Sequence, residues 1–259
     1  MSLLDNSKSY DTILTERVTN YLIANYPPAL HLTRNEDSLD VYINKYVQSL
    51  GLHTTGFGRT GKFFDLLVWK NERDTTYSIY LKGEKINSRV IMMDNFITLG
   101  WEEYATLGVA YPGGWSTTEA LYCVEKSYDL NSEHFLISYL AHEGRHFSDF
   151  ILFPKLKSAD LEYRAKLTEL SMAQTTLYDL INFFIINSNY DSDNGHEVAN
   201  YCAIRDISKI VFKTEFEKDI NEWKKLSTKK INDAAYQAFV ANTKALEKQG
   251  KDVEKYIKK

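Results

Sequence analysis

Apolar residues recur at helical spacing through most of the first fifty positions of the chain. Positions 10–26 form the first run, and the pair Pro27-Pro28 predicts its end. Positions 37–50 form a second, shorter amphipathic run that ends at Gly51. Closely spaced glycines then follow and indicate loops or tight turns. The chain is therefore expected to begin with two helices.

The next segments are composed of residues that favour strands. Positions 63–70, 75–81 and 89–99 are rich in β-branched and aromatic side chains, and polar turn residues separate them. They predict three strands of a small antiparallel sheet. The sequence Tyr-Pro-Gly-Gly-Trp at 111–115 predicts a sharp break, and positions 117–125 predict a fourth strand.

From Asn131 onward the pattern predicts an almost wholly helical half. Asn131-Ser132 supplies an N-cap with Glu133 in the first turn, and apolar residues then recur at helical spacing until Pro154. The later helices are expected over 159–187, over 196–212 and, as one or two helices, in the last forty residues.

This order of elements predicts an α+β fold, in which a small, mainly antiparallel sheet precedes a large helical half. The chain length fits one or two domains. We expect 1–130, with the N-terminal helices and the sheet, and 131–259, with the helical half, to form one compact unit.

Composition and charge exclude several classes of protein. The 259 residues carry 31 Lys and Arg against 35 Asp and Glu, without the basic excess typical of nucleic-acid-binding proteins. The longest nearly apolar stretch, 180–186, is too short to span a membrane. Cys123 and Cys202 have no C-x-x-C spacing, so we expect two buried apolar side chains. The first residues show no signal-peptide pattern, which favours a cytoplasmic location, whereas an upstream leader would direct export.

One motif in the helical half carries chemistry: it is H-E-x-x-H, formed by His142-Glu143-Gly144-Arg145-His146. Residues four apart on a helix share a face, so both imidazoles can bind one zinc ion. Glu143 then lies where a carboxylate can take a proton from a metal-bound water. Gly144 costs about 1 kcal/mol relative to alanine in a helix, which suggests a close approach by substrate or a neighbouring backbone.

A catalytic zinc ion usually has three protein ligands and one open position. Pro154 lets the following helix fold back, and Glu162 lies in the first turn of that helix. Ala165 is on the same face, and its small side chain permits close approach of the two helices. Glu162 is our first choice for the third ligand. Glu169, two turns along, is the alternative ligand or a hydrogen-bonding partner of a ligand.

These segments resemble the gluzincin group of zinc metallopeptidases over about thirty residues. The resemblance lies in the H-E-x-x-H motif and in Glu162-Tyr163-Arg164-Ala165, an E-x-x-A pattern. It implies a zincin-like fold in which His142, His146 and Glu162 hold zinc and Glu143 activates water. It also implies that 1–130 forms one wall of a cleft, where an edge strand pairs with an extended substrate. The segment 111–115 is a candidate for the rim of that cleft.

Two further side chains are candidates for supporting roles. Asp149 lies near the face of the two histidines and could accept a hydrogen bond from one of them. His196 opens a later helix and is our first choice for donating a hydrogen bond to developing negative charge.

The leading functional prediction is a zinc-dependent peptidase that acts on peptides or proteins through one zinc ion. A second hypothesis keeps the metal but replaces the substrate with an amide or another acyl compound. A third is a helical interaction protein with a degenerate site. Nucleic acid is not an expected partner, because the charge is nearly balanced.

Overall fold

The structure is a computed structural model that describes residues 9–31, 36–60 and 63–258. The chain forms two compact units: 1–73 with 92–112, and 74–91 with 113–259. Two long strands, β4 (Leu67–Leu81) and β5 (Glu84–Leu99), each run from one unit into the other. Helices and a mainly antiparallel sheet occur together, as the predicted α+β class requires.

The first unit contains the two predicted N-terminal helices, α1 (Tyr10–Asn25) and α2 (Glu36–Ser49). A 3-10 turn, η1 (Pro27–His31), follows α1 where the two prolines predict its end. The core of the unit is apolar and consists of Leu22, Ala29, Leu39, Ile43, Val47 and Val68. The remaining elements of this unit are the short β2 (Gly58–Thr60) and β3 (Phe63–Asp65), which pair with each other, and α3 (Trp101–Ala105).

The five-stranded sheet has the order β1-β4-β5-β7-β6. Its short strands are β1 (His53–Thr54), β6 (Gly114–Ser116) and β7 (Leu121–Val124). The prediction of separate strands over 63–70 and 75–81 is wrong, because β4 continues through the polar residues between them. Those residues are exposed and remain in the strand, whereas the sequence pattern suggested a turn. The predicted break at 111–115 is also partly wrong, because Gly114 begins the edge strand β6.

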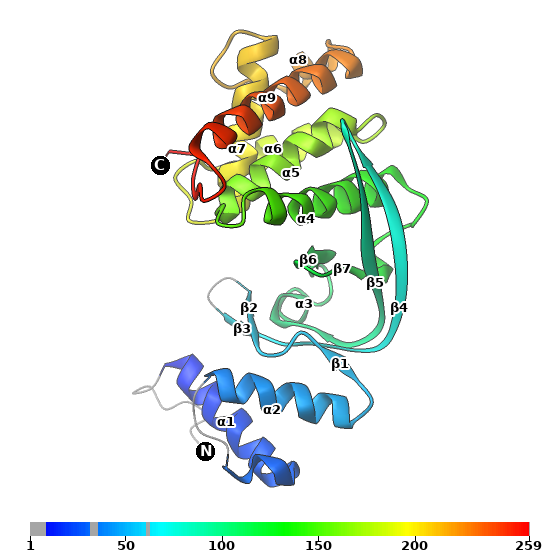
Figure 1. The fold of residues 1–259 in the computed structure, drawn as a ribbon, viewed down its shortest axis with the longest axis vertical. Helices are drawn as coiled ribbons and strands as arrows, with labels where there is room; N and C mark the ends of the chain where they lie inside the picture. The colour runs from blue at the N-terminus through cyan, green and yellow to red at the C-terminus, as the bar shows by residue number, and fades with distance from the viewer. Residues whose placement is uncertain (1–8, 32–35, 61–62, 259) are drawn as a thin grey trace. The chain divides into compact units, whose positions relative to one another are not determined.

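In the second unit, α5 (Ser158–Met172) is packed between α4 (His142–Leu152) on one side and α7 (Gly195–Val211) and α9 (Thr228–Gln249) on the other (Figure 1). The shorter helices are α6 (Leu177–Ile186) and α8 (Ile220–Lys224). The hydrophobic core shared by the helices of this unit includes Leu167, Leu170, Ile181, Ile204 and Trp223. Because α5 is central, nearly every side chain on it is buried, including its charged ones.

The predicted helix over 159–187 is two helices. The chain leaves α5 at Ala173 and re-enters a helix at Leu177. The Glu133 carboxylate accepts hydrogen bonds from the backbone N–H groups of Gln174, Thr175 and Thr176, which holds the connection in place. No proline or glycine marks this break, so the hydrophobic pattern runs through it.

A π-helix, η3 (His134–Ala141), directly precedes α4. Ser132 Oγ accepts a hydrogen bond from the backbone N–H of Phe135, but the N-cap position is Glu133, one residue later than the sequence predicted. The wider π-helical winding was not foreseen, because apolar spacing alone does not separate it from an α-helix. Such segments are rare and frequently occur at functional sites.

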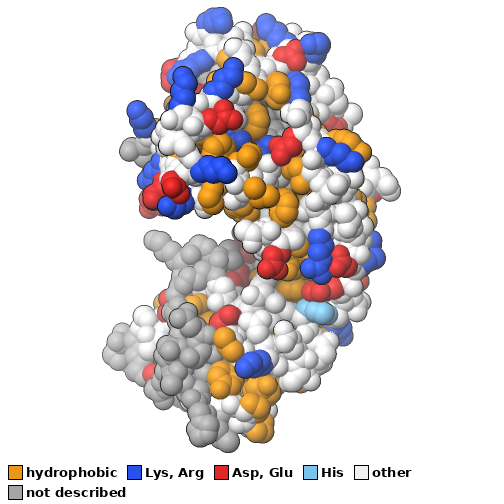
Figure 2. All heavy atoms as spheres, in the orientation of Figure 1, with side chains coloured by type: hydrophobic (Ala, Val, Ile, Leu, Met, Phe, Trp, Pro, Cys, Tyr) orange, Lys and Arg blue, Asp and Glu red, His pale blue; other side chains and the backbone are white. Residues whose placement is uncertain are grey.

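Two features of the surface and interior complete the fold. Cys123 and Cys202 are both buried, as predicted. On the face shown in Figure 2, charged side chains of both signs are interspersed over the second unit, with hydrophobic side chains between them. No described helix is both long and apolar enough to cross a membrane.

Candidate metal centre

The H-E-x-x-H motif places two imidazoles together at the start of α4. His142 is its first residue and His146 lies one turn later, so both rings point from one face of the helix. Their Nε2 atoms are 3.1 Å apart. Glu162, in the second turn of α5, faces them: its Oε2 is 3.4 Å from His142 Nε2 and its Oε1 is 3.3 Å from His146 Nε2. Within the described residues, these three side chains form the one cluster suited to a metal ion.

The geometry of this cluster fits a tetrahedral zinc ion. Ligand atoms 2.0–2.1 Å from zinc at tetrahedral angles lie about 3.3 Å from one another. The two Nε2 atoms are 3.1 Å apart, and each lies 3.3–3.4 Å from a different oxygen of the Glu162 carboxylate. Two polar atoms of the cluster, Glu162 Oε2 and His146 Nδ1, are buried without a hydrogen-bond partner among the described residues. A cation among the three side chains would satisfy the carboxylate oxygen. Two histidines and one carboxylate are also a known zinc ligand set.

Glu169 lies behind the first histidine. Its Oε1 is 2.6 Å from His142 Nδ1, and its side chain is 4% exposed. A carboxylate at this position accepts a hydrogen bond from Nδ1–H and leaves the Nε2 lone pair directed at the other two side chains. The structure therefore places Glu162 in the metal-binding cluster and Glu169 as the partner of His142.

The prediction that Asp149 bonds to a histidine is wrong. Asp149 is fully buried and receives two hydrogen bonds from Arg164, from Nε at 2.7 Å and from Nη2 at 3.0 Å. Arg145 Nη2 lies 3.0 Å from the same carboxylate. Three residues beyond His146, the helix has turned Asp149 toward α5, where Arg164 meets it.

A chain of charged side chains ties these helices to other elements of the second unit. Arg145 Nη1 donates to Glu84 Oε2 at 2.7 Å, and Ser148 Oγ donates to Glu84 Oε1 at 2.6 Å. Although burial opposes it, these bonds and the Arg145 charge lower the pKa of Glu84. On the other side, Arg164 Nη1 donates to Asn242 Oδ1 on α9 at 2.8 Å. The two helices that carry the candidate ligands, α4 and α5, are thus held in place by hydrogen bonds and ion pairs of side chains outside the cluster.

The cluster has strongly coupled protonation. Burial disfavours the charged imidazole, but Glu169 and Glu162 outweigh it and raise the pKa of His142 to about 10 in the metal-free protein. Burial likewise opposes the charged form of Glu162, yet the nearby imidazoles of His142, His146 and His196 hold its pKa well below the usual range. The carboxylates therefore attract positive charge to this position, as a proton or as a metal cation.

A cavity of about 280 Å³ opens beside the cluster. Glu143 lines it, as do Gly114, Trp115 and Ser116 of the edge strand β6. Its apolar wall consists of Phe150 and Leu161 together with Trp115. The predicted general base, the candidate ligand cluster and the last two residues of the predicted rim segment, Gly114 and Trp115, therefore border one space.

Two glycines near the cluster have packing reasons. A Cβ on Gly144 would lie 3.2 Å from two side-chain atoms of Ile79 on β4. The close neighbour of Gly144 is thus the Ile79 side chain, and not the substrate or backbone that the sequence suggested. A Cβ on Gly114 would clash with the backbone oxygen of Tyr122 on β7 and would lie 2.5 Å from the ring of Tyr139 on η3, so only glycine fits at this point of the edge strand.

His196 lies in the first turn of α7, which Asn194 caps. Its side chain is 61% exposed, and its Nδ1 is 3.0 Å from Glu162 Oε2. The starts of α5 and α7 nearly touch, since a Cβ on Gly195 would lie 2.6 Å from Ser158 Oγ. This contact brings His196 to the cavity, as the sequence predicted, although its closest acidic contact is the ligand carboxylate.

Sequence reasoning missed Lys166 and Glu84. Lys166 is buried beside the cluster, with Nζ 3.9 Å from Glu162 Oε2. Its position four residues after Glu162 was a usable signal, because the two share a helix face. Glu84 had no such signal, since it reaches α4 from a strand 61 residues away in sequence.

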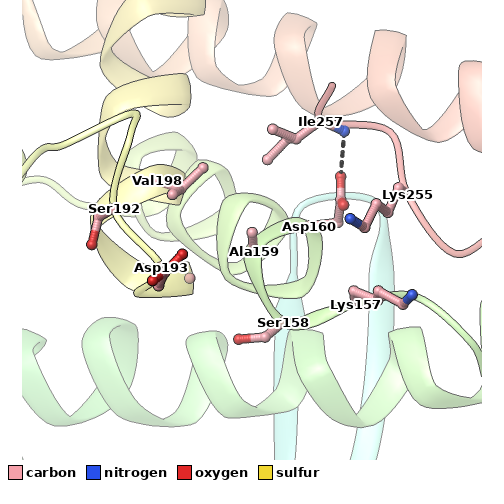
Figure 3. A pocket seen from close by; sticks show the side chains of 10 residues that line it. Lys157, Ser158, Ala159, Asp160, Ser192, Asp193, Val198, Lys255 and Ile257 are labelled. Carbon is pink, nitrogen blue, oxygen red and sulfur yellow. Dashed lines mark hydrogen bonds between the residues drawn. The ribbon is translucent and has the colours of Figure 1, made fainter. Parts of the chain in front are cut away.

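A second cavity lies around the other side of the α5 start (Figure 3). Ser158 borders both cavities. In the second one, Asp160 Oδ1 accepts hydrogen bonds from the backbone N–H groups of Tyr256 and Ile257, which fastens the C-terminal segment to α5. Burial raises the pKa of Asp160. Its role here is structural, because it anchors the helix that carries Glu162.

Comparison of the chain with protein-family models, with curated proteins and with solved structures found no match. What can be said of its chemistry therefore comes from its own residues. The central observation is that His142 and His146 on α4 and Glu162 on the next helix, α5, converge at metal-binding distance beside a cavity.

Proposed function

We propose that this protein is a zinc-dependent peptidase of zincin-like architecture, similar to the gluzincin group. The observation that carries the proposal is the pair of Nε2 atoms 3.1 Å apart, each 3.3–3.4 Å from one oxygen of the Glu162 carboxylate, next to Glu143 in a cavity bounded by an edge strand. His142, His146 and Glu162 hold one zinc ion. Bound there, the ion supplies Lewis acidity toward a carbonyl and a water molecule.

Glu143 is the general base of the proposed reaction. It is adjacent in sequence to His142 and lines the cavity, so its carboxylate can take the proton of the attacking water. The same carboxylate then delivers this proton to the leaving amine. Peptide-bond cleavage needs both transfers, and one correctly placed carboxylate performs them in turn.

The edge strand β6 offers backbone groups to an extended substrate. Val124 N–H donates to the Gly113 carbonyl and Thr117 N–H donates to the Ala120 carbonyl, so hydrogen bonding to β7 alternates along this strand. In that register, the N–H and C=O groups of Gly114 and Ser116 point away from β7. An extended peptide can pair with them, which gives affinity that depends little on side chains.

His196 is the proposed donor to the developing oxyanion. Its exposed ring contacts Glu162 at the edge of the cavity. A short rotation of such a ring brings an N–H toward a carbonyl held beside the cluster. Hydrogen bonds of this kind stabilise the charge that builds up during attack.

The test compares Glu143→Gln with the parent on a peptide library, after both proteins are loaded with zinc. We expect the variant to retain one zinc ion and to lose at least about 100-fold in cleavage rate. Glu119→Gln, an exposed residue of the β6–β7 turn, is the matched control and should cleave like the parent. Equal cleavage by Glu143→Gln would exclude the assigned base. A zinc-loaded parent that cuts amides or esters but no peptide would support the acyl-hydrolase hypothesis instead.

A further inference from the structure

Lys166 is a buried cation beside the candidate metal centre. Its side chain is 6% exposed, and its Nζ lies 3.9 Å from Glu162 Oε2. The ammonium also lies 4.7 Å from the centre of the Phe184 ring on α6. Lysine is almost never buried to this degree without an opposite charge, so its charge belongs to the electrostatics of this centre.

Two carboxylates share its helix face. Glu162, Lys166 and Glu169 follow one another at four- and three-residue spacing on α5, so they lie along one face of that helix. The side chains of Glu162 and Glu169 are 11% and 4% exposed. Two poorly solvated negative charges thus flank His142, and one positive charge lies between them along the helix.

The Lys166 contact is too long to be what positions Glu162. The carboxylate of Glu162 has shorter contacts with three histidines, at 3.0, 3.3 and 3.4 Å. At 3.9 Å, the ammonium is beyond hydrogen-bond distance. Its effect on the centre is therefore that of a charge acting through space.

We propose that Lys166 is a fixed positive charge that limits the affinity of the His142, His146 and Glu162 centre for a dication; this rests on the metal binding in the proposed function. Lys166 attracts the Glu162 carboxylate whether a metal is bound or not. It repels a dication only when the dication is present, so the net effect is weaker binding. At this range, in a poorly solvated site, a unit charge has a large effect. A bound cation that is less neutralised by its surroundings is also the stronger Lewis acid.

The test is the zinc dissociation constant of Lys166→Met, measured by competition with a chromophoric chelator at pH 8. Methionine keeps the length of the side chain and its packing against Phe184 but removes the charge. We expect zinc to bind at least about tenfold more tightly than in the parent, and Lys166→Arg to bind it like the parent. Lys157→Met, an exposed lysine just before α5, is the matched control and should leave the constant unchanged.

Affinity that is unchanged within about twofold, or weaker, would overturn the inference, because a lysine that held Glu162 in place would give that result. If Lys166→Met does not fold by circular dichroism, Lys166→Gln replaces it with the same expected direction. The measurement needs no turnover, so the two proposals fail separately. A parent that binds zinc and shows the Lys166 effect but cuts no substrate contradicts only the peptidase proposal. A parent that binds no zinc contradicts both.

Discussion

His142 Nδ1 lies 2.6 Å from Glu169 Oε1, and this contact determines which nitrogen of the ring faces the other two candidate ligands. The carboxylate comes from α5, two turns after Glu162, so one helix supplies both a ligand and the partner of another ligand. This arrangement joins α4 and α5 into a single metal-binding unit. It also makes the role of Glu169 testable apart from that of Glu162.

Glu169→Gln should weaken zinc binding by about 10–100-fold, because an amide does not hold the Nδ1 proton as a carboxylate does. The variant should still bind one zinc ion per chain. Chelator competition gives the affinity. Glu197→Gln, next to His196 but outside both cavities, serves as the control. Parent-like affinity in Glu169→Gln would show that the ring is oriented without this contact.

Zinc binding should release a proton. The pKa of His142 is raised to about 10 in the metal-free protein, so this ring is protonated at pH 8 and becomes a ligand only after losing its proton. Zinc affinity should then rise by up to about tenfold per pH unit as pH increases toward 10, and fall as pH decreases. Calorimetry in buffers of different ionisation enthalpy should show about one proton released per zinc ion. An affinity that does not change between pH 7 and 9 would contradict this assignment.

Gly144→Ala should reveal the packing of α4 against β4. Alanine gains about 1 kcal/mol in helix propensity, but its Cβ would lie 3.2 Å from Ile79 side-chain atoms. In the parent we expect the substitution to lower the free energy of unfolding or leave it unchanged. In an Ile79→Ala background, where the obstruction is gone, the same substitution should stabilise by about 1 kcal/mol. Urea denaturation of the parent, the two single variants and the double variant gives the coupling free energy between the two positions. Additive effects would mean that Ile79 does not explain the glycine.

Asp149→Ala should be strongly destabilising. Asp149 and Arg164 are at most 1% exposed and share two hydrogen bonds, so removing the carboxylate leaves a buried guanidinium without its main partner. Loss of one member of such a pair typically costs about 3–5 kcal/mol. Denaturant unfolding measures the loss. The exposed pair of Lys229 and Asp233 is the comparison, since Asp233→Ala should barely move the unfolding midpoint. A small effect for Asp149→Ala would show that the ion pairs of Asp149 with Arg145 and Arg164 are not needed for stability.

Local spacing in the sequence was sufficient to predict the cluster of candidate metal ligands. The four-residue interval between His142 and His146, on a segment with helical periodicity, is a short-range property. The place of Glu162 followed from a single break at Pro154 and a small residue one turn on. The helix bearing the cluster therefore came from patterns confined to a few turns of chain, whereas the α+β class came from the order of helical and strand segments along the sequence.

The errors arose where the partner is distant in sequence or where no residue marks a boundary. The exposed, charged residues in the middle of β4 suggested a turn. They belong to the strand because of its pairing with other strands, which their composition does not reveal. The break between α5 and α6 is made by Glu133, about forty residues earlier. Asp149 was assigned to the histidines because Arg164 could not be placed opposite it without the tertiary structure.

The most direct test of the central claim is the metal content of the purified protein and of His142→Ala after both are loaded with zinc and dialysed. The account predicts one zinc ion retained per parent chain, with anomalous scattering in crystals locating it among His142, His146 and Glu162. The variant should retain none while remaining folded. A parent that retains no zinc, or a variant that retains as much as the parent, would contradict the assigned centre.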